Sequence, residues 1–179
     1  MDKVIAFSSF SIMKKPYGDP VVTGFEALTP PVFRVAEEAE GFIARAKEID
    51  DLEHLGNFER DWGEWGEFAV PDYYDGGFTI AEETRAGTLS IWEDIGSVHK
   101  FTYSGLHGIA FKQRHKWFRE IDYPTHVIWW INRGETPTWK QSVERYDSLH
   151  TNGPTPFAFN FQHTFDSAGN PLTGFDAGR

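Results

Sequence analysis

The sequence predicts an α+β domain in which an antiparallel sheet of four or five strands packs against helices in the ferredoxin-like arrangement. The 179 residues suit one domain. Strand-like and helix-like segments follow in the order β-α-β, a long loop, then β-α-β-α-β, which contains the split β-α-β unit. We expect the helices on one face of the sheet. A second copy would cover the other face across a two-fold axis, giving a dimer.

The predicted strands are short runs rich in β-branched and aromatic residues. In the last of them, Phe157, Phe159 and Phe161 alternate with smaller or polar residues, which indicates a half-buried strand. The five segments are 4–10, 42–46, 88–92, 126–131 and 157–161.

Three helices are predicted from their start and stop signals. Pro30 and Pro31 suit a first helical turn, so we expect a helix over 31–40, ended by Gly41. A second stretch over 95–119 follows Asp94 as a cap, with a break near Gly105 or Gly108. A third helix runs over 137–150 and stops at the Asn-Gly-Pro of 152–154.

We expect a single domain over residues 1–165 with an aromatic insertion at about 47–86, and a flexible C-terminal tail over 166–179. A loop as long as the insertion is usually functional or partly disordered. Its large rings argue against plain disorder, which is poor in aromatic residues. We therefore interpret the insertion as a lid or a specificity element; the rings are Trp62, Trp65, Phe68, Tyr73 and Tyr74.

The composition excludes several classes of protein. A net charge of −10 argues against a nucleic-acid partner, because phosphate binding needs a basic surface. The absence of cysteine excludes disulfides, thiolate metal sites and a cysteine nucleophile. The apolar run at 4–10 is too short to span a membrane and lacks a signal-peptide pattern, so we expect a cytoplasmic protein without a membrane partner. With 16 Phe, 7 Trp and 6 Tyr, the chain has a bulky core or an aromatic pocket.

The second half of the chain carries a series of short motifs. In order they are Ser-Ile-Trp-Glu (90–93), Tyr-Ser-Gly-Leu-His (103–107), Arg-His-Lys-Trp-Phe (114–118), Val-Ile-Trp-Trp (127–130), Gly-Glu-Thr-Pro-Thr (134–138) and Gly-Pro-Thr-Pro (153–156). This series resembles an uncharacterised family of small domains in the dimeric α/β-barrel superfamily, which includes antibiotic-biosynthesis monooxygenases. The resemblance implies an intersubunit barrel or a pocket beside the sheet, and a recurrent imidazole at His107. The insertion departs from the family pattern.

One predicted helix carries a stripe of polar and aromatic residues at four-residue spacing. We assign His107 as a candidate general acid/base, because an imidazole titrates near neutrality. Tyr103 is the candidate hydrogen-bond donor to an oxyanion. The alternative is a helix interface of mixed polarity. The stripe comprises His99, Tyr103, His107, Phe111 and His115.

Further candidates for substrate binding are tryptophans and a tyrosine. Trp129 and Trp130 must point to opposite faces of their strand, and Trp130 shares its face with His126, so we favour Trp130 for the cavity. Trp92 joins it from a neighbouring strand, and the insertion supplies Trp62, Trp65 and Tyr73. The carboxylates of Asp61, Glu64 and Glu67 could supply a base from the lid, or could simply solvate the loop.

No metal or cofactor is expected. Two helical turns separate His99 from His107 by roughly 12 Å, too far to share one ion. The sequence therefore favours an enzyme that oxygenates, cyclises or isomerises an apolar ring-containing small molecule without a cofactor. A haem enzyme with His107 or His163 as axial ligand is one alternative. A non-catalytic ligand-binding or assembly module is the other.

Overall fold

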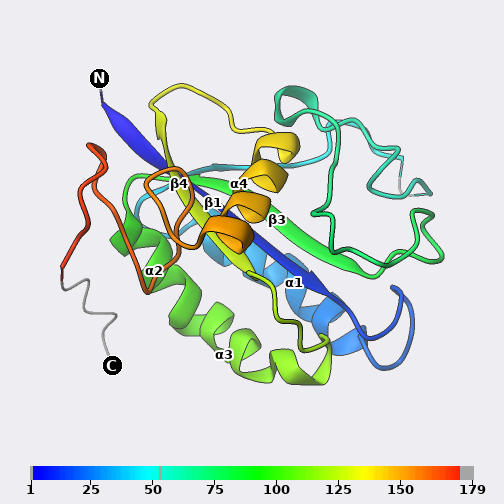
Figure 1. Ribbon diagram of the computed structural model, residues 1–179. Coiled ribbons are helices and arrows are strands. Elements are labelled where there is room, and N and C mark those ends of the chain that lie inside the picture. Colours follow the sequence, from blue (N-terminus) through cyan, green and yellow to red (C-terminus); the bar gives the residue numbers. More distant parts are fainter. Residues whose placement is uncertain (1, 53, 174–179) are drawn as a thin grey trace.

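The computed structural model describes residues 2–52 and 54–173 (Figure 1). Within these residues, one four-stranded antiparallel sheet is flanked by helices. The strands are β1 (Lys3–Ile12), β2 (Phe42–Arg45), β3 (Arg85–Trp92) and β4 (His126–Asn132). The helices are α1 (Thr23–Glu37), α2 (Ile95–Tyr103), α3 (Gly105–Gln113) and α4 (Trp139–Asn152), with short 3₁₀ turns η1 (Gly63–Trp65) and η2 (Arg114–Lys116).

The strand order is β2-β3-β1-β4, the order of a ferredoxin-like fold. Helix α1 connects β1 to β2, and α2 with α3 connects β3 to β4, so each pair forms a split β-α-β unit around a central strand. In the register, Ile5 of β1 lies opposite Trp92 on one side and Trp130 on the other. The predicted α+β class and ferredoxin-like arrangement are confirmed.

Helices α1, α2 and α3 cover one face of the sheet. On this face Ile5, Phe7 and Ile128 pack with Val98 and Phe101 of α2. Helix α1 lies beside α3 and β2. We call this the helix face.

Helix α4 and the insertion cover the opposite face, which we call the insertion face. Val4, Ala6 and Phe10 of β1 pack there with Trp139 and Tyr146 of α4. The Tyr146 hydroxyl donates a hydrogen bond to the carbonyl of Ser8 (2.9 Å), which holds α4 on the central strand. The expected uncovered face is therefore covered by this chain itself.

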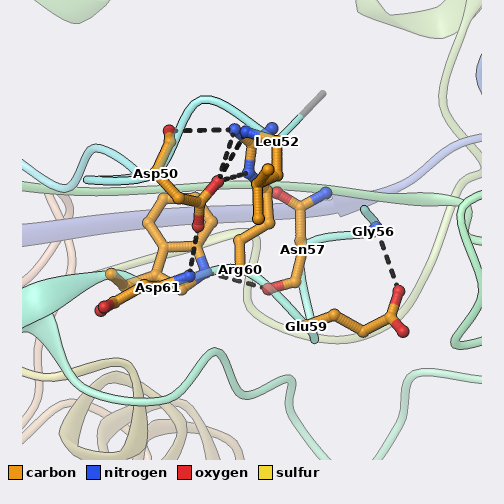
Figure 2. A network of polar contacts seen from close by, with 8 residues as sticks. Asp50, Leu52, Gly56, Asn57, Glu59, Arg60 and Asp61 are labelled. Atoms are coloured by element: carbon orange, nitrogen blue, oxygen red, sulfur yellow. Dashed lines mark hydrogen bonds and ion pairs between the residues drawn. The ribbon is translucent and has the colours of Figure 1, made fainter. Parts of the chain in front are cut away.

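The segment between β2 and β3 is largely irregular but well connected. Figure 2 shows the carboxylate of Asp50 accepting hydrogen bonds from Arg60, from the backbone N–H of Leu52 and from that of Asp61. The indole of Trp62 donates to the carbonyl of Asn57 (2.9 Å). These local bonds hold the loop in one shape and turn its rings toward the sheet.

Two predicted elements differ. Helix α1 begins at Thr23, and Pro30 and Pro31 lie inside it. The carbonyls of Glu26 and Ala27 lose their helical partners to these prolines, but they sit on a partly exposed helix where water can bind them.

Residues 157–161 do not form a strand. Phe159 alone pairs with Ile128, through two backbone hydrogen bonds of 2.8 and 3.0 Å, because tight bridges at Thr155–Ala158 and Asn160–His163 turn the chain on both sides.

The predicted break in the long helix lies at Gly105. Its φ of +54° is unfavourable for residues that have a β-carbon. Of the predicted tail, residues 166–170 form a hydrogen-bonded turn around Asp166, and 174–179 lie outside the described residues.

Candidate functional site

A cavity of about 910 Å³ lies between the helix face of the sheet, α1 and α3. Its floor includes Phe7 and Ser9 of β1, and its walls include Leu28 and Val32 of α1 and Phe111 of α3. The volume suits a small molecule of drug-like size, and the lining combines aromatic and aliphatic side chains with arginines, glutamates and histidines.

The cavity continues around the free edge of β3. Strand β2 ends at Arg45, opposite Ser90, and the N–H of Ala46 donates one further hydrogen bond to the carbonyl of Leu89 (2.8 Å). Among the described residues, no strand pairs with residues 85–88 on that side. Side chains from both faces of this stretch line the cavity: Thr88 from the helix face, and Arg85 and Leu89 from the insertion face. The cavity therefore has one end under α3 and another under the insertion.

His107 lies at the α3 end and is held by one hydrogen bond. Its Nδ1 is 2.7 Å from the carbonyl oxygen of Thr102. A carbonyl can only accept, so Nδ1 carries the proton and Nε2 is the basic nitrogen. Burial lowers the pKa of His107, so the ring is neutral at physiological pH.

The chain break before His107 sets its position. Ser104 is extended between α2 and α3, and Gly108 packs so closely that a β-carbon there would lie 2.6 Å from the carbonyl oxygen of Tyr103. Glycine at 108 thus lets the first turn of α3 fold back onto the end of α2. This fold-back brings His107 next to the ring of Phe101 (4.7 Å between centroids) and into the cavity wall.

Tyr103 lines the same end and is 41% exposed. Its ring contacts Phe111 and Phe161 edge-on, with centroids 5.3 and 5.6 Å apart. Partial burial raises the pKa of Tyr103, so its hydroxyl keeps its proton and can donate a hydrogen bond.

His126 is a cavity residue that the sequence argument did not select. It projects from β4 on the helix face and stacks on Phe161, with centroids 5.0 Å apart. Its Nε2 is buried without a hydrogen-bond partner among the described residues. Burial lowers the pKa of His126 to about 4, so this imidazole is also neutral. His126 lies on the same face of the predicted strand as Trp130, and this was the signal in the sequence that could have identified it.

The insertion end of the cavity contains a buried ion pair, also missed from the sequence. Glu83 and Arg85 are 2% and 6% exposed, and Arg85 Nε lies 3.5 Å from Glu83 Oε2. Asn57 donates to the other oxygen of Glu83 (2.7 Å). The signal in the sequence was a pair of opposite charges two residues apart at the start of a strand. This spacing places both side chains on one face.

Five of the predicted site residues line the cavity: Tyr103, His107, Phe111, His115 and Trp62. The structure places the other five elsewhere. Trp92 is a core residue whose indole donates to Ser90 Oγ (2.9 Å), and Trp130 donates to the carbonyl of Phe165 (2.8 Å).

The remaining three also lie outside the cavity lining. His99 contacts the rings of Tyr103 and Phe161. Trp65 packs against the core of the insertion face. Tyr73 stacks on Tyr123, with centroids 4.3 Å apart, and donates to the carbonyl of Pro124.

The candidate carboxylates of the insertion are not in the cavity wall. Asp61 accepts a hydrogen bond from the N–H of Gly63, Glu64 accepts one from Thr136, and Glu67 is exposed. His163, the second candidate haem ligand, is also exposed and outside the cavity lining. Across residues 2–52 and 54–173, no group of three or more His, Asp or Glu side chains could hold a metal ion.

Fold and site together define a ferredoxin-like α+β protein with an aromatic cavity whose wall contains His107 and His126, both with lowered pKa values, and Tyr103. Residues 4–173 match the family described as a domain of unknown function (DUF3291), and the chain belongs to this family. The match spans the sheet, the insertion and every cavity residue discussed above. No curated protein and no solved structure matches the chain. In the described part of the chain, no helix is both long and apolar enough to cross a bilayer.

Proposed function

We propose that the protein is an enzyme that binds an apolar, ring-containing small molecule and transforms it by acid–base chemistry without a cofactor. The observation that carries this proposal is the cavity itself, with His107, His126 and Tyr103 set among aromatic and aliphatic walls. Polar contacts are stronger in a partly buried site than in bulk water, because the effective dielectric constant is lower there.

The roles of the polar groups follow from their protonation. His107 Nε2 can remove a proton from a carbon next to a carbonyl group of the substrate. The electron pair moves to the carbonyl oxygen, where the protonated Tyr103 hydroxyl can stabilise the developing charge. Return of the proton at another carbon of the conjugated system gives isomerisation. Attack of the carbanion on a second carbonyl carbon of the substrate, whose oxygen then takes up the proton from His107, gives cyclisation. Addition of dioxygen gives a hydroperoxide, which loses water to leave a new carbonyl group and so completes oxygenation.

Three further parts of the proposal rest on the resemblance and on composition. They are membership of the dimeric α/β-barrel superfamily, assembly as a homodimer and a cytoplasmic location without nucleic-acid or membrane partners. The ferredoxin-like strand order supports the first of them.

Hydrogen–deuterium exchange into an enolisable aryl ketone tests the chemistry without knowledge of the natural substrate. We expect the protein to bind 1-tetralone, with quenching of tryptophan fluorescence because Trp62 lines the cavity. In D₂O it should speed exchange at the carbon next to the carbonyl. Binding without exchange would favour a non-catalytic binding module, a Soret band in the purified protein would favour a haem enzyme, and failure to bind any ring compound would contradict the proposal.

A further inference from the structure

The arginines of the cavity wall differ in what holds them. Three lie within 3.0 Å of a carboxylate oxygen: Arg45 beside Glu37 (2.8 Å), Arg60 beside Asp50 (3.0 Å) and Arg119 beside Asp75 (2.8 Å). Arg114 donates to the carbonyl of Phe111. The Arg85 guanidinium makes no hydrogen bond to any described residue, although it is the most deeply buried of the five.

Arg85 is nevertheless firmly placed. Its guanidinium lies over the ring of Phe68, 4.7 Å from the centroid, and its own backbone carbonyl accepts a hydrogen bond from Tyr17 (3.2 Å). Its Nε faces Glu83 Oε2 at 3.5 Å, too far for a good hydrogen bond. The two terminal nitrogens therefore remain as unused donors in the wall of the cavity.

A ligand that meets these two donors of a largely buried side chain gains charge-assisted hydrogen bonds. The outer edge of a guanidinium presents two parallel N–H groups that fit a carboxylate in a bidentate pair. Glu83 beside it already neutralises part of the positive charge, and Glu48 and Glu120 also line the cavity. A monoanion is therefore favoured over a dianion such as a phosphate monoester.

We propose that Arg85 binds a carboxylate group of the ligand, so that the cavity selects ring-containing carboxylic acids. The acid group lies under the insertion, and the ring extends along the apolar wall past the β3 edge toward His107. This assignment rests on the proposed function, since it names the class of molecule that the same cavity takes.

The test compares three probes with one ring system: 2-naphthoate, the neutral 2-naphthamide and the dianionic 2-naphthyl phosphate. Affinities are measured by calorimetric titration at neutral pH. We expect 2-naphthoate to bind about 10- to 100-fold more tightly than 2-naphthamide, the usual worth of a charge-assisted hydrogen bond. Arg85→Gln should remove this preference, so that 2-naphthoate and 2-naphthamide bind with similar affinity.

Two further variants keep the test decisive if Arg85→Gln is unstable. Arg85→Lys retains the charge but loses the planar fork, so its preference for the acid should fall between those of the wild type and Arg85→Gln. The double variant Glu83→Gln/Arg85→Gln removes both charges of the pair and should show no preference. Arg133→Gln is the charge-matched control, because Arg133 pairs with Asp2 and Glu93 outside the cavity; it should keep the full preference.

The outcomes separate the two proposals. Equal binding of 2-naphthoate and 2-naphthamide by the wild type would overturn the carboxylate assignment and leave the ring pocket standing. Tighter binding of 2-naphthyl phosphate than of 2-naphthoate would overturn it in favour of a phosphate ligand. Binding of none of the three probes would overturn the ring pocket and the carboxylate assignment together.

Discussion

The two nitrogens of His107 have separate environments, and this separation allows its roles to be tested independently. Nδ1 donates to the Thr102 carbonyl and fixes the ring, whereas Nε2 is the nitrogen available for proton transfer. Asparagine can replace the donor near the position of Nδ1 but has no group at the position of Nε2. Glutamine, whose side chain is longer, has no donor near the position of Nδ1.

We expect His107→Asn and His107→Gln to lower the rate of exchange into 1-tetralone by about 10²- to 10⁴-fold, the usual contribution of general acid–base catalysis. The free energy of unfolding should fall by about 1 kcal/mol in His107→Gln and less in His107→Asn, because only the latter keeps the bond to Thr102. Rate and melting temperature are measured on the same preparation. Full activity with a lowered melting temperature would remove His107 from the mechanism and leave His126 as the base.

His126 makes the stability of the protein depend on pH. Its pKa is about 4 in the folded protein, below the 6.5 of an unperturbed histidine, so between these values the unfolded chain binds more protons than the folded one. Stability is therefore present above pH 6.5 and is lost as the pH falls toward 4, by up to about 3 kcal/mol. Denaturant unfolding at a series of pH values measures this loss. His126→Phe should lose less stability over the same pH interval. An equal loss of stability with falling pH in the variant and the wild type would contradict this role of His126.

At the scale of elements, the insertion is part of the core as well as a cavity wall. Trp62, Phe68 and Tyr74 are buried against Trp139 of α4 and against the sheet. If the insertion were only a lid, a deletion such as that of residues 61–75 would leave the fold intact. Their burial now predicts that such a deletion would expose the insertion face and destabilise the whole domain.

Two phenylalanines of the insertion give a matched test. Phe68 is 8% exposed and contacts Trp62 and Trp139, whereas Phe78 is 58% exposed. We expect Phe68→Ala to lower the free energy of unfolding by about 3–5 kcal/mol and Phe78→Ala by less than about 1 kcal/mol. Chemical denaturation of both variants measures the difference. Similar small losses would show that the insertion is a detachable lid.

At the scale of the whole molecule, the surface for a dimer must be reconsidered. The prediction of a homodimer assumed a sheet face that lacked helices, and α4 with the insertion covers that face. The homodimer itself stays a prediction, but it must use another surface. Light scattering at micromolar concentration should give about twice the chain mass of 20.5 kDa. A mass of 20.5 kDa would contradict the homodimer. If mutation of a residue buried under α4 lowered the mass, the cause would be unfolding of the chain and not the loss of a dimer interface.

The elements that could be predicted depend on short-range patterns. The β-branched and aromatic runs over 4–10 and 126–131, the cap at Asp94 and the Asn-Gly-Pro stop at 152–154 involve neighbouring residues, and the structure contains these strands and helices. The start of α1 was misplaced because proline is also tolerated inside a helix when the carbonyls that lose their N–H partners are solvated. The phenylalanine alternation at 157–161 was misleading because turns on both sides limit its pairing to Phe159.

By itself, the sequence determined the α+β class, four of the strands and a helix break near Gly105 or Gly108, and it named His107 and Tyr103 as candidates, which line one cavity in the structure. Only the tertiary structure decided which rings line a cavity and which fill the core, as Trp62 and Trp92 illustrate. It also brought Asn57, Glu83 and Arg85 to the cavity that His107 and His126 line. The physical reason is that burial and pairing depend on contacts between residues far apart in the chain, which no local pattern encodes.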